Sequence, residues 1–368
     1  MRPTVSRSTL AESFHVAQDP EAASSTSPNK PRDTMSFSDS NVTTPSQISI
    51  HPQSSSPAAS HHLIYFITGN PGLIGYYDTF LHSLHLLLGA SDSQVAYHIH
   101  GQSLAGFVDI PSDTRTTPYG LEEQIRFSLF TLQSQRIPCG PQEGQYYQSV
   151  ILLGHSVGSY ILLEIIKRLG ENSPVKIKAG ILLFPTITHI AKSPSGVKIS
   201  TLFRIPNLPK RVGTVAKALV LLTPGNALRW LVGLVARMPR EAAEVTASFL
   251  RSRMGVWQAL HMAKDEMDFI TEDRWDDDVW GVEHENLDTK SENPRLILYF
   301  GQNDHWVADH TRDALIAARG REEGATESSK PVMLIDDRGI PHGFCIRHSE
   351  IVAEKVGVWI DELMAETQ

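Results

Sequence analysis

The stretch Gly154-His155-Ser156-Val157-Gly158 decides the fold, because it joins an apolar run at 150–153 to a segment with helical apolar spacing at 160–169. A strand, a tight G-x-S-x-G turn and a helix, in that order, lift a serine hydroxyl clear of a sheet. The glycines meet a steric need, since a Cβ at either position would collide with the neighbouring strand or helix. The motif predicts that Ser156 is a nucleophile; a glycine-bounded turn without chemistry is the alternative.

Strands and helices alternate on both sides of this turn. Apolar runs of strand length occur at 63–68, 94–98, 179–184, 295–300 and 332–335. Segments with helical spacing occur at 77–88, 121–135 and 351–364. This alternation predicts an α/β fold with a mostly parallel central sheet and helices on both faces.

Composition predicts how the chain is divided. Residues 1–60 are rich in Ser, Thr and Pro, and large apolar residues are scarce from 21 to 60, so we expect a disordered tail. The folded domain is predicted at 61–368. Regular alternation is interrupted at 186–293, which predicts an insertion with a basic stretch (186–263) followed by an acidic one (265–292). These stretches either pair with each other or face different surroundings.

Charge and cysteine content exclude several classes of protein. A net charge of -8 argues against a general nucleic-acid binder. The two cysteines, Cys139 and Cys345, cannot build a disulfide framework and belong to no metal-spaced cluster, which favours a reducing compartment. Residues 1–23 contain no apolar core of a secretory signal. We expect no metal and no organic cofactor.

A serine nucleophile needs a general base, and the base needs a carboxylate to orient it. In sheets with this turn the partners follow in the order Ser, acid, His, on loops beyond later strands. Asp304 follows the strand predicted at 296–300, and His342 follows the one at 332–335. The sequence therefore predicts the triad Ser156, Asp304 and His342.

Each assignment has an alternative. Asp304 could cap the helix that follows it. His155 is predicted to pack beside the nucleophile with its ring turned from the reacting atoms. The remaining rivals are Asp336 and Asp337 for the acid, which precede His342 too closely to reach its far nitrogen easily, and His305 and His348 for the base.

Acyl transfer also requires donors for the oxyanion. The backbone N–H of Val157, directly after the nucleophile, is the first candidate. The second is the N–H of Asn70, in the Gly69-Asn70-Pro71-Gly72 turn after the early strand, because Pro71 has no N–H. Leu73 is the alternative if the register is shifted, and a simple Asn-Pro-Gly turn is the interpretation without function.

The combination of motifs resembles the lipid-droplet-associated hydrolase family and its α/β-hydrolase fold. The resemblance runs from His62 to the C-terminus and rests on Gly69-Asn70-Pro71-Gly72, Gly75-Tyr76-Tyr77, Gly154 to Tyr160, Phe300 to Trp306 and His342-Gly343-Phe344. It implies a serine hydrolase of ester lipids, of the sterol ester or acylglycerol type. It also implies the lipid droplet surface as location, with the endoplasmic reticulum membrane or cytosol as alternatives. Rival functions are a thioesterase, an acyltransferase, or a non-catalytic droplet-binding scaffold.

In such a fold the 186–293 insertion is expected to form a helical cap over the site. Its segment 215–235 is unusually apolar, but 223–226 interrupts it, and neither half reaches the roughly twenty residues that a spanning helix needs. A hairpin that dips into a droplet or membrane monolayer is predicted, with Trp230 at the interface and basic residues at phosphate level. Two buried cap helices are the alternative.

Overall fold

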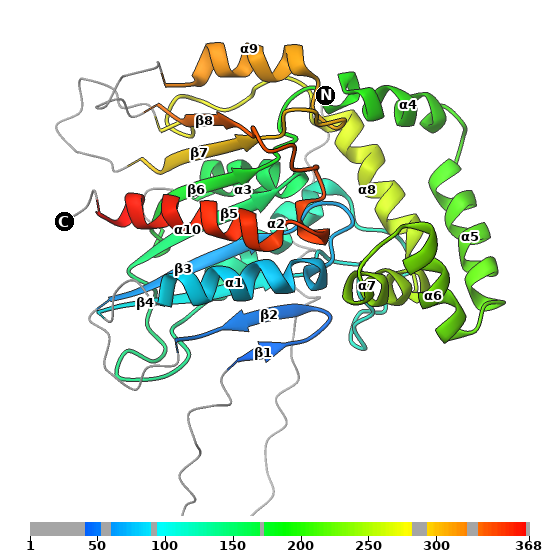
Figure 1. The fold of residues 1–368 in the computed structure, drawn as a ribbon, viewed down its shortest axis with the longest axis horizontal. Helices are drawn as coiled ribbons and strands as arrows, with labels where there is room; N and C mark the ends of the chain where they lie inside the picture. The colour runs from blue at the N-terminus through cyan, green and yellow to red at the C-terminus, as the bar shows by residue number, and fades with distance from the viewer. Residues whose placement is uncertain are drawn as a thin grey trace, which may run out of the picture. The chain divides into compact units, whose positions relative to one another are not determined.

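The computed structural model describes residues 41–52, 60–89, 94–169, 173–281, 293–321 and 330–365. Eight strands form one sheet in the order β1-β2-β4-β3-β5-β6-β7-β8 (Figure 1). The strands from β3 to β8 pair in parallel, whereas β1 and β2 are antiparallel to their neighbours. Their bounds are β1 Val42–Thr43, β2 Gln47–Ile50, β3 Ser60–Ile67, β4 Val95–Gln102, β5 Ser149–His155, β6 Ile177–Leu183, β7 Arg295–Phe300 and β8 Val332–Ile335.

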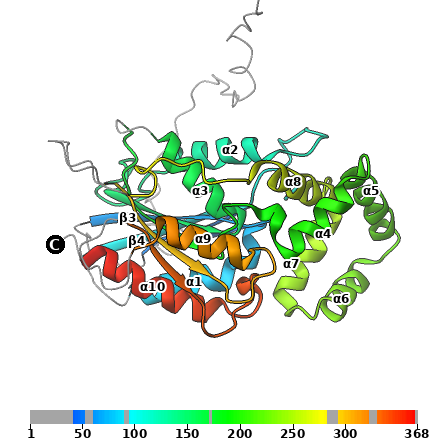
Figure 2. The same cartoon turned by 90° about the horizontal axis from the view of Figure 1, so that it is seen from above.

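Helices cover both faces of the sheet. Figure 2 shows α2 (Leu121–Ser134) and α3 (Val157–Arg168) on one side, with α1 (Asp78–Gly89) and α10 (Ser349–Ala365) on the other. The apolar run before the elbow serves both faces, because side chains alternate along a strand. Val150 and Leu152 of β5 join the α2–α3 cluster, and Ile151 and Leu153 join the α1–α10 cluster. The predicted α/β sheet is therefore confirmed.

The prediction of a disordered tail is wrong for 42–50, where β1 and β2 extend the sheet. Ile48 and Ile50 are buried, and β2 pairs antiparallel with β4, Ile50 lying opposite Ile99. Two isoleucines with one residue between them suffice for a short strand between β1 and β4, but Ser, Thr and Pro around them conceal the pattern. Residues 1–40 and 53–59 of the predicted tail lie outside the described residues.

The described part of the predicted insertion contains five α-helices: α4 Pro194–Phe203, α5 Leu208–Leu221, α6 Gly225–Val235, α7 Arg240–Arg251 and α8 Val256–Phe269. Figures 1 and 2 show them beyond one end of the sheet. They lie at the carboxyl ends of the parallel strands, because the side chain of Asn70, just after β3, donates to the Ala259 carbonyl of α8 (3.0 Å). Within the described ranges, no helix is both long and apolar enough to cross a bilayer.

Candidate active site

The elbow forms where β5 ends and α3 begins. Ser156 has φ 55° and ψ -124°, a conformation that L residues rarely adopt. A Cβ on Gly154 would stand 2.6 Å from the carbonyl oxygen of Gly158, and one on Gly158 would collide with the carbonyl oxygen of Ile67. The steric reason for both glycines is confirmed: the turn brings α3 back against β5 and β3 so closely that no side chain fits.

Three segments far apart in the sequence meet at this serine. His342 Nε2 lies 2.9 Å from Ser156 Oγ, and His342 Nδ1 lies 2.6 Å from Asp304 Oδ2. A carboxylate only accepts, so Nδ1–H donates to Asp304 and Nε2 is left to accept the serine O–H. The structure thus brings together all three residues that the sequence assigned to the triad, in the geometry of nucleophile, base and orienting acid.

Asp304 remains ionised in this arrangement. Burial alone would raise the pKa of Asp304, but the hydrogen bond and charge of His342, with the Trp306 N–H that donates to Oδ1 (2.8 Å), outweigh burial and lower it. The alternative role as a helix cap does not apply, because α9 (Asp309–Arg319) begins later and its N-cap is Ala308. The exposed His305 ring lies 3.8 Å from the same carboxylate, on the other oxygen.

Apart from His305, the rival acids and bases make no hydrogen bond to Ser156, His342 or Asp304 within the described residues. Asp336 is buried and accepts from the Tyr299 hydroxyl and from the Ile340 N–H (2.6 Å), so it shapes the loop that carries His342. Asp337 is exposed. In the described part of the chain, Nδ1 of His348 makes no hydrogen bond.

The two candidate oxyanion donors flank the serine. A Cβ on Gly69 would stand 3.1 Å from Ser156 Cβ, so the turn containing Asn70 lies directly against the nucleophile. Among the described residues, the backbone N–H groups of Asn70 and Val157 have no protein acceptor. The N–H of Leu73, the alternative donor, is engaged with the carbonyl of Pro71 (2.8 Å). The arrangement favours Asn70 over Leu73.

His155 is buried, as expected for a packing residue, but it also makes two specific hydrogen bonds. Its Nδ1 lies 2.7 Å from the Tyr77 hydroxyl, and its Nε2 lies 2.8 Å from the backbone carbonyl of His342. Burial, and after it the neighbouring charge of His342, lowers the pKa of His155 to about 3, so the ring is neutral. No local sequence pattern predicts these partners, which come from distant segments.

Glu266 is a second feature that sequence reasoning missed. It lies on cap helix α8, is 4% exposed, and accepts at Oε1 from the side-chain amide of Asn70 (2.8 Å). Burial raises the pKa of Glu266 to about 8, and neighbouring Asp265 adds to the rise, whereas the Asn70 bond lowers it. In the sequence, Glu266 is one of many acids in the stretch 265–292 and therefore resembles a solvent-exposed residue. Only the fold shows that it is a neutral carboxyl against the turn at Asn70.

Solved structures with similar folds are α/β-hydrolases. A peroxisomal α/β-hydrolase from Saccharomyces cerevisiae matches with a TM-score of 0.55 at 14% identity, over 86% of this chain and 80% of that one. Juvenile hormone epoxide hydrolase from Bombyx mori matches with a TM-score of 0.54 at 12% identity, over 88% and 74%. These likenesses show the fold alone.

Sequence relatives are more specific. The chain is 27% identical to the lipid droplet-associated hydrolase of Gallus gallus, over 81% of this chain and 84% of the relative. It is 24% identical to the Dictyostelium discoideum protein of the same name, over 84% and 90%. The family model described as lipid-droplet associated hydrolase matches residues 60–345. The chain is thus a hydrolase with the α/β-hydrolase fold, and it belongs to the lipid-droplet-associated hydrolase family.

Proposed function

We propose that this protein is a serine hydrolase that cleaves carboxylic esters of hydrophobic lipids, of the sterol ester or acylglycerol type, at the lipid droplet surface. The observation that carries the proposal is the contact chain from Ser156 Oγ through His342 to Asp304, at 2.9 and 2.6 Å. The names of the relatives support a lipid droplet location and a hydrolytic activity.

The proposed reaction follows from the positions of these groups. His342 Nε2 removes the serine proton while Oγ attacks the ester carbonyl, and the N–H groups of Asn70 and Val157 bind the oxyanion. Collapse of this intermediate leaves an acyl group on Ser156, and the imidazolium returns its proton to the departing alcohol. Water, deprotonated by His342, then attacks the acyl-enzyme and releases the acid. Asp304 stabilises the imidazolium in both halves.

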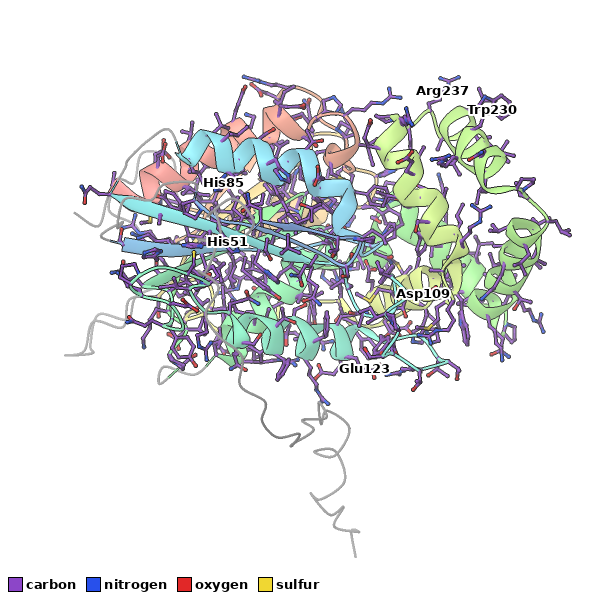
Figure 3. All side chains as sticks on the ribbon, turned by 90° about the horizontal axis from the view of Figure 1, so that it is seen from below. His51, His85, Asp109, Glu123, Trp230 and Arg237 are labelled. Atoms are coloured by element: carbon purple, nitrogen blue, oxygen red, sulfur yellow. The ribbon has the colours of Figure 1, made fainter. Side chains whose placement is uncertain are left out.

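The cap helices offer a surface for the droplet. Side chains at 212, 215, 219 and 222 recur at helical spacing and are exposed, with Leu222 at 84%. On α6, Trp230 (68%) and Val235 (74%) are exposed as well, and Figure 3 shows Trp230 and Arg237 on the outer side of the cap. We call this surface the apolar cap face. Its exposure speaks against the alternative of two buried helices.

Length and charge suit a helix pair that lies in a monolayer. At 14 and 11 residues, α5 and α6 are each shorter than the roughly 30 Å core of a bilayer. The stretch 186–263 contains eleven Lys and Arg residues against two Glu, in a chain whose net charge is -8. Basic side chains beside an exposed apolar face fit a surface with phosphate head groups.

An active-site-directed fluorophosphonate tests the proposal. We expect the folded wild type, supplied with lipid, to be labelled and Ser156→Ala to remain unlabelled, with His305→Ala, an exposed neighbour outside the triad, labelled as a control. A wild type that is folded but unlabelled would support the scaffold instead.

Product analysis with and without an acceptor alcohol separates hydrolysis from acyl transfer. Thioester substrates test the thioesterase alternative.

A further inference from the structure

Tyr77 and His155 lie buried between the two loops that the proposed reaction uses, yet neither has a role in it. We call residues 69–72 the oxyanion loop and residues 336–343 the base loop. The Gly69 N–H of the oxyanion loop donates to the Tyr77 hydroxyl (3.1 Å), and that hydroxyl lies 2.7 Å from His155 Nδ1. His155 Nε2 in turn lies 2.8 Å from the His342 carbonyl of the base loop. The contacts form one unbroken path.

The direction of each bond in this path is fixed by chemistry. A backbone carbonyl only accepts, so His155 carries its proton on Nε2 and donates to the carbonyl of His342. His155 Nδ1 is then bare and accepts from the Tyr77 O–H, whose oxygen accepts from the Gly69 N–H. No other tautomer of a neutral His155 ring satisfies all three hydrogen bonds, so each bond has only one possible direction.

Packing around His155 keeps this state. The Phe344 ring stands at 89° to the His155 ring with centroids 5.1 Å apart, and Phe184 approaches at 78° and 6.2 Å. A Cβ on Gly69 would stand 2.9 Å from His155 Nδ1, so the oxyanion loop lies directly on the ring. Burial lowers the pKa of His155 to about 3, and a neutral ring is what the path requires.

We infer that Tyr77 and His155 are positioning residues: they fix the oxyanion loop and the base loop relative to each other, so that donor and base address the same carbonyl. Gly69 precedes the peptide N–H of Asn70, and the bonded carbonyl belongs to His342 itself. One end of the path is therefore adjacent to the proposed oxyanion donor, and the other end is the backbone of the proposed base. The inference rests on the proposed function and adds two residues that never touch the substrate.

Four variants test the inference. Tyr77→Phe removes the hydroxyl and leaves Gly69 N–H and His155 Nδ1 unpaired. His155→Leu removes both ring nitrogens, whereas His155→Gln keeps one acceptor and one donor. The matched control is Tyr65→Phe, because Tyr65 is as buried as Tyr77 (both 2% exposed) but donates to the Ser128 carbonyl on α2. For each variant we would measure the fluorophosphonate labelling rate constant, the labelled fraction at completion, the melting temperature, and kcat and KM for a p-nitrophenyl ester.

Two unpaired buried groups predict a loss of about ten- to a hundredfold in labelling rate constant and kcat for Tyr77→Phe and His155→Leu. In these two variants we expect KM and the labelled fraction to stay near the wild-type values. His155→Gln should recover much of the rate. Tyr65→Phe should lower only the melting temperature. Wild-type rate constants in Tyr77→Phe and His155→Leu would overturn this inference, as would a loss confined to the labelled fraction. A wild type that is never labelled would instead contradict the proposed function, and with it this inference.

Discussion

Asp304 illustrates how one side chain combines two effects that oppose each other. Burial disfavours its charge, but the hydrogen bond and charge of His342 hold its pKa below the ordinary value. A carboxylate fixes the Nδ1–H tautomer of His342, and an amide can present a donor there and force the other tautomer. We expect Asp304→Asn to lower kcat by roughly 10⁴-fold, the loss that this tautomer change causes in serine hydrolase triads. The control is Asp337→Asn, an exposed neighbour of the base loop; equal kcat in both variants would remove Asp304 from the mechanism.

Glu266 predicts a pH effect on stability that can be assigned to one carboxyl. Its pKa rises from 4.5 to about 8 on folding, so its contribution is complete below pH 4.5 and is lost as pH rises through 8. Glu266→Gln is neutral at every pH and keeps an acceptor for Asn70. We expect the variant to gain stability over wild type between pH 4.5 and 8, reaching a few kcal/mol by order of magnitude.

Urea unfolding at pH 5, 7 and 9 measures this gain. The control is Glu272→Gln, which changes an exposed acid shortly after α8. Its free energy of unfolding should differ from that of the wild type by the same amount at all three pH values. A constant difference between Glu266→Gln and wild type across the three pH values would show that Glu266 is ionised throughout.

At the residue scale, sequence predicted what local context determines. The elbow and the meeting of Asp304 and His342 at Ser156 follow from motif and loop order, because parallel strands deliver their carboxyl ends to one edge. The bonds of His155 to His342 and of Asn70 to Glu266 span 187 and 196 residues, and no local pattern announces them. Both hydrogen bonds depend on how the base loop and the cap pack against the sheet.

At the element scale, the apolar cap face makes a prediction about location. Leu219→Glu with Leu222→Glu places charges in that face without removing a buried side chain. We measure the fraction of protein that floats with triolein droplets coated by a phospholipid monolayer. We expect the ratio of bound to free protein to fall about tenfold or more, since each leucine buried in the monolayer contributes roughly 1.5–3 kcal/mol. Leu86→Glu, on α1 and 72% exposed, is the control and should float as wild type does.

Flotation unchanged by the Leu219 and Leu222 substitutions would rule out this face as the droplet contact. Flotation lost equally in Leu86→Glu would mean that net charge, not the face, governs binding.

Elements were predicted well where apolar periodicity was strong and poorly where it was short. The strands from β3 to β7 and the helices around them follow from long apolar runs, and β8 follows from four consecutive apolar residues, Val332–Ile335, whereas only two of the four residues of β2 are apolar. β2 was missed because four residues, Gln47–Ile50, carry the whole signal. In the cap, the sequence showed an apolar segment but could not show which side of each helix faces the protein, because that depends on how α5 packs on α8.

For the whole molecule, buried histidines predict sensitivity to acid. Burial lowers the pKa of His51, His62 and His100 to about 4 and that of His98 to about 3, from an ordinary value of 6.5. His98 bridges the β2 and β3 ends through His51 (3.0 Å) and His61 (2.9 Å), and Figure 3 shows His51 on the sheet. Unfolding frees these rings to bind protons, so their contribution is present above pH 6.5 and is lost as pH falls towards 4.

The melting temperature should therefore fall steadily from pH 6.5 to 4. His98→Asn, which cannot titrate, should reduce that slope, whereas replacement of the exposed His305 by Asn should not. Glu266 acts in the opposite direction over part of this range, so the measurement is made in the Glu266→Gln variant; a melting temperature that is flat there would mean that the rings bind protons as readily in the folded protein as in the unfolded chain.

The proposed reaction depends on an acyl group that Ser156 carries between the two half-reactions. Intact-protein and peptide mass spectrometry after rapid acid quenching of a p-nitrophenyl ester reaction tests it most directly. We predict an acyl adduct on the peptide containing Ser156, absent in Ser156→Ala and formed far more slowly in His342→Ala. Ester turnover without any adduct in the wild type, or an adduct that maps to another residue, would contradict the claim.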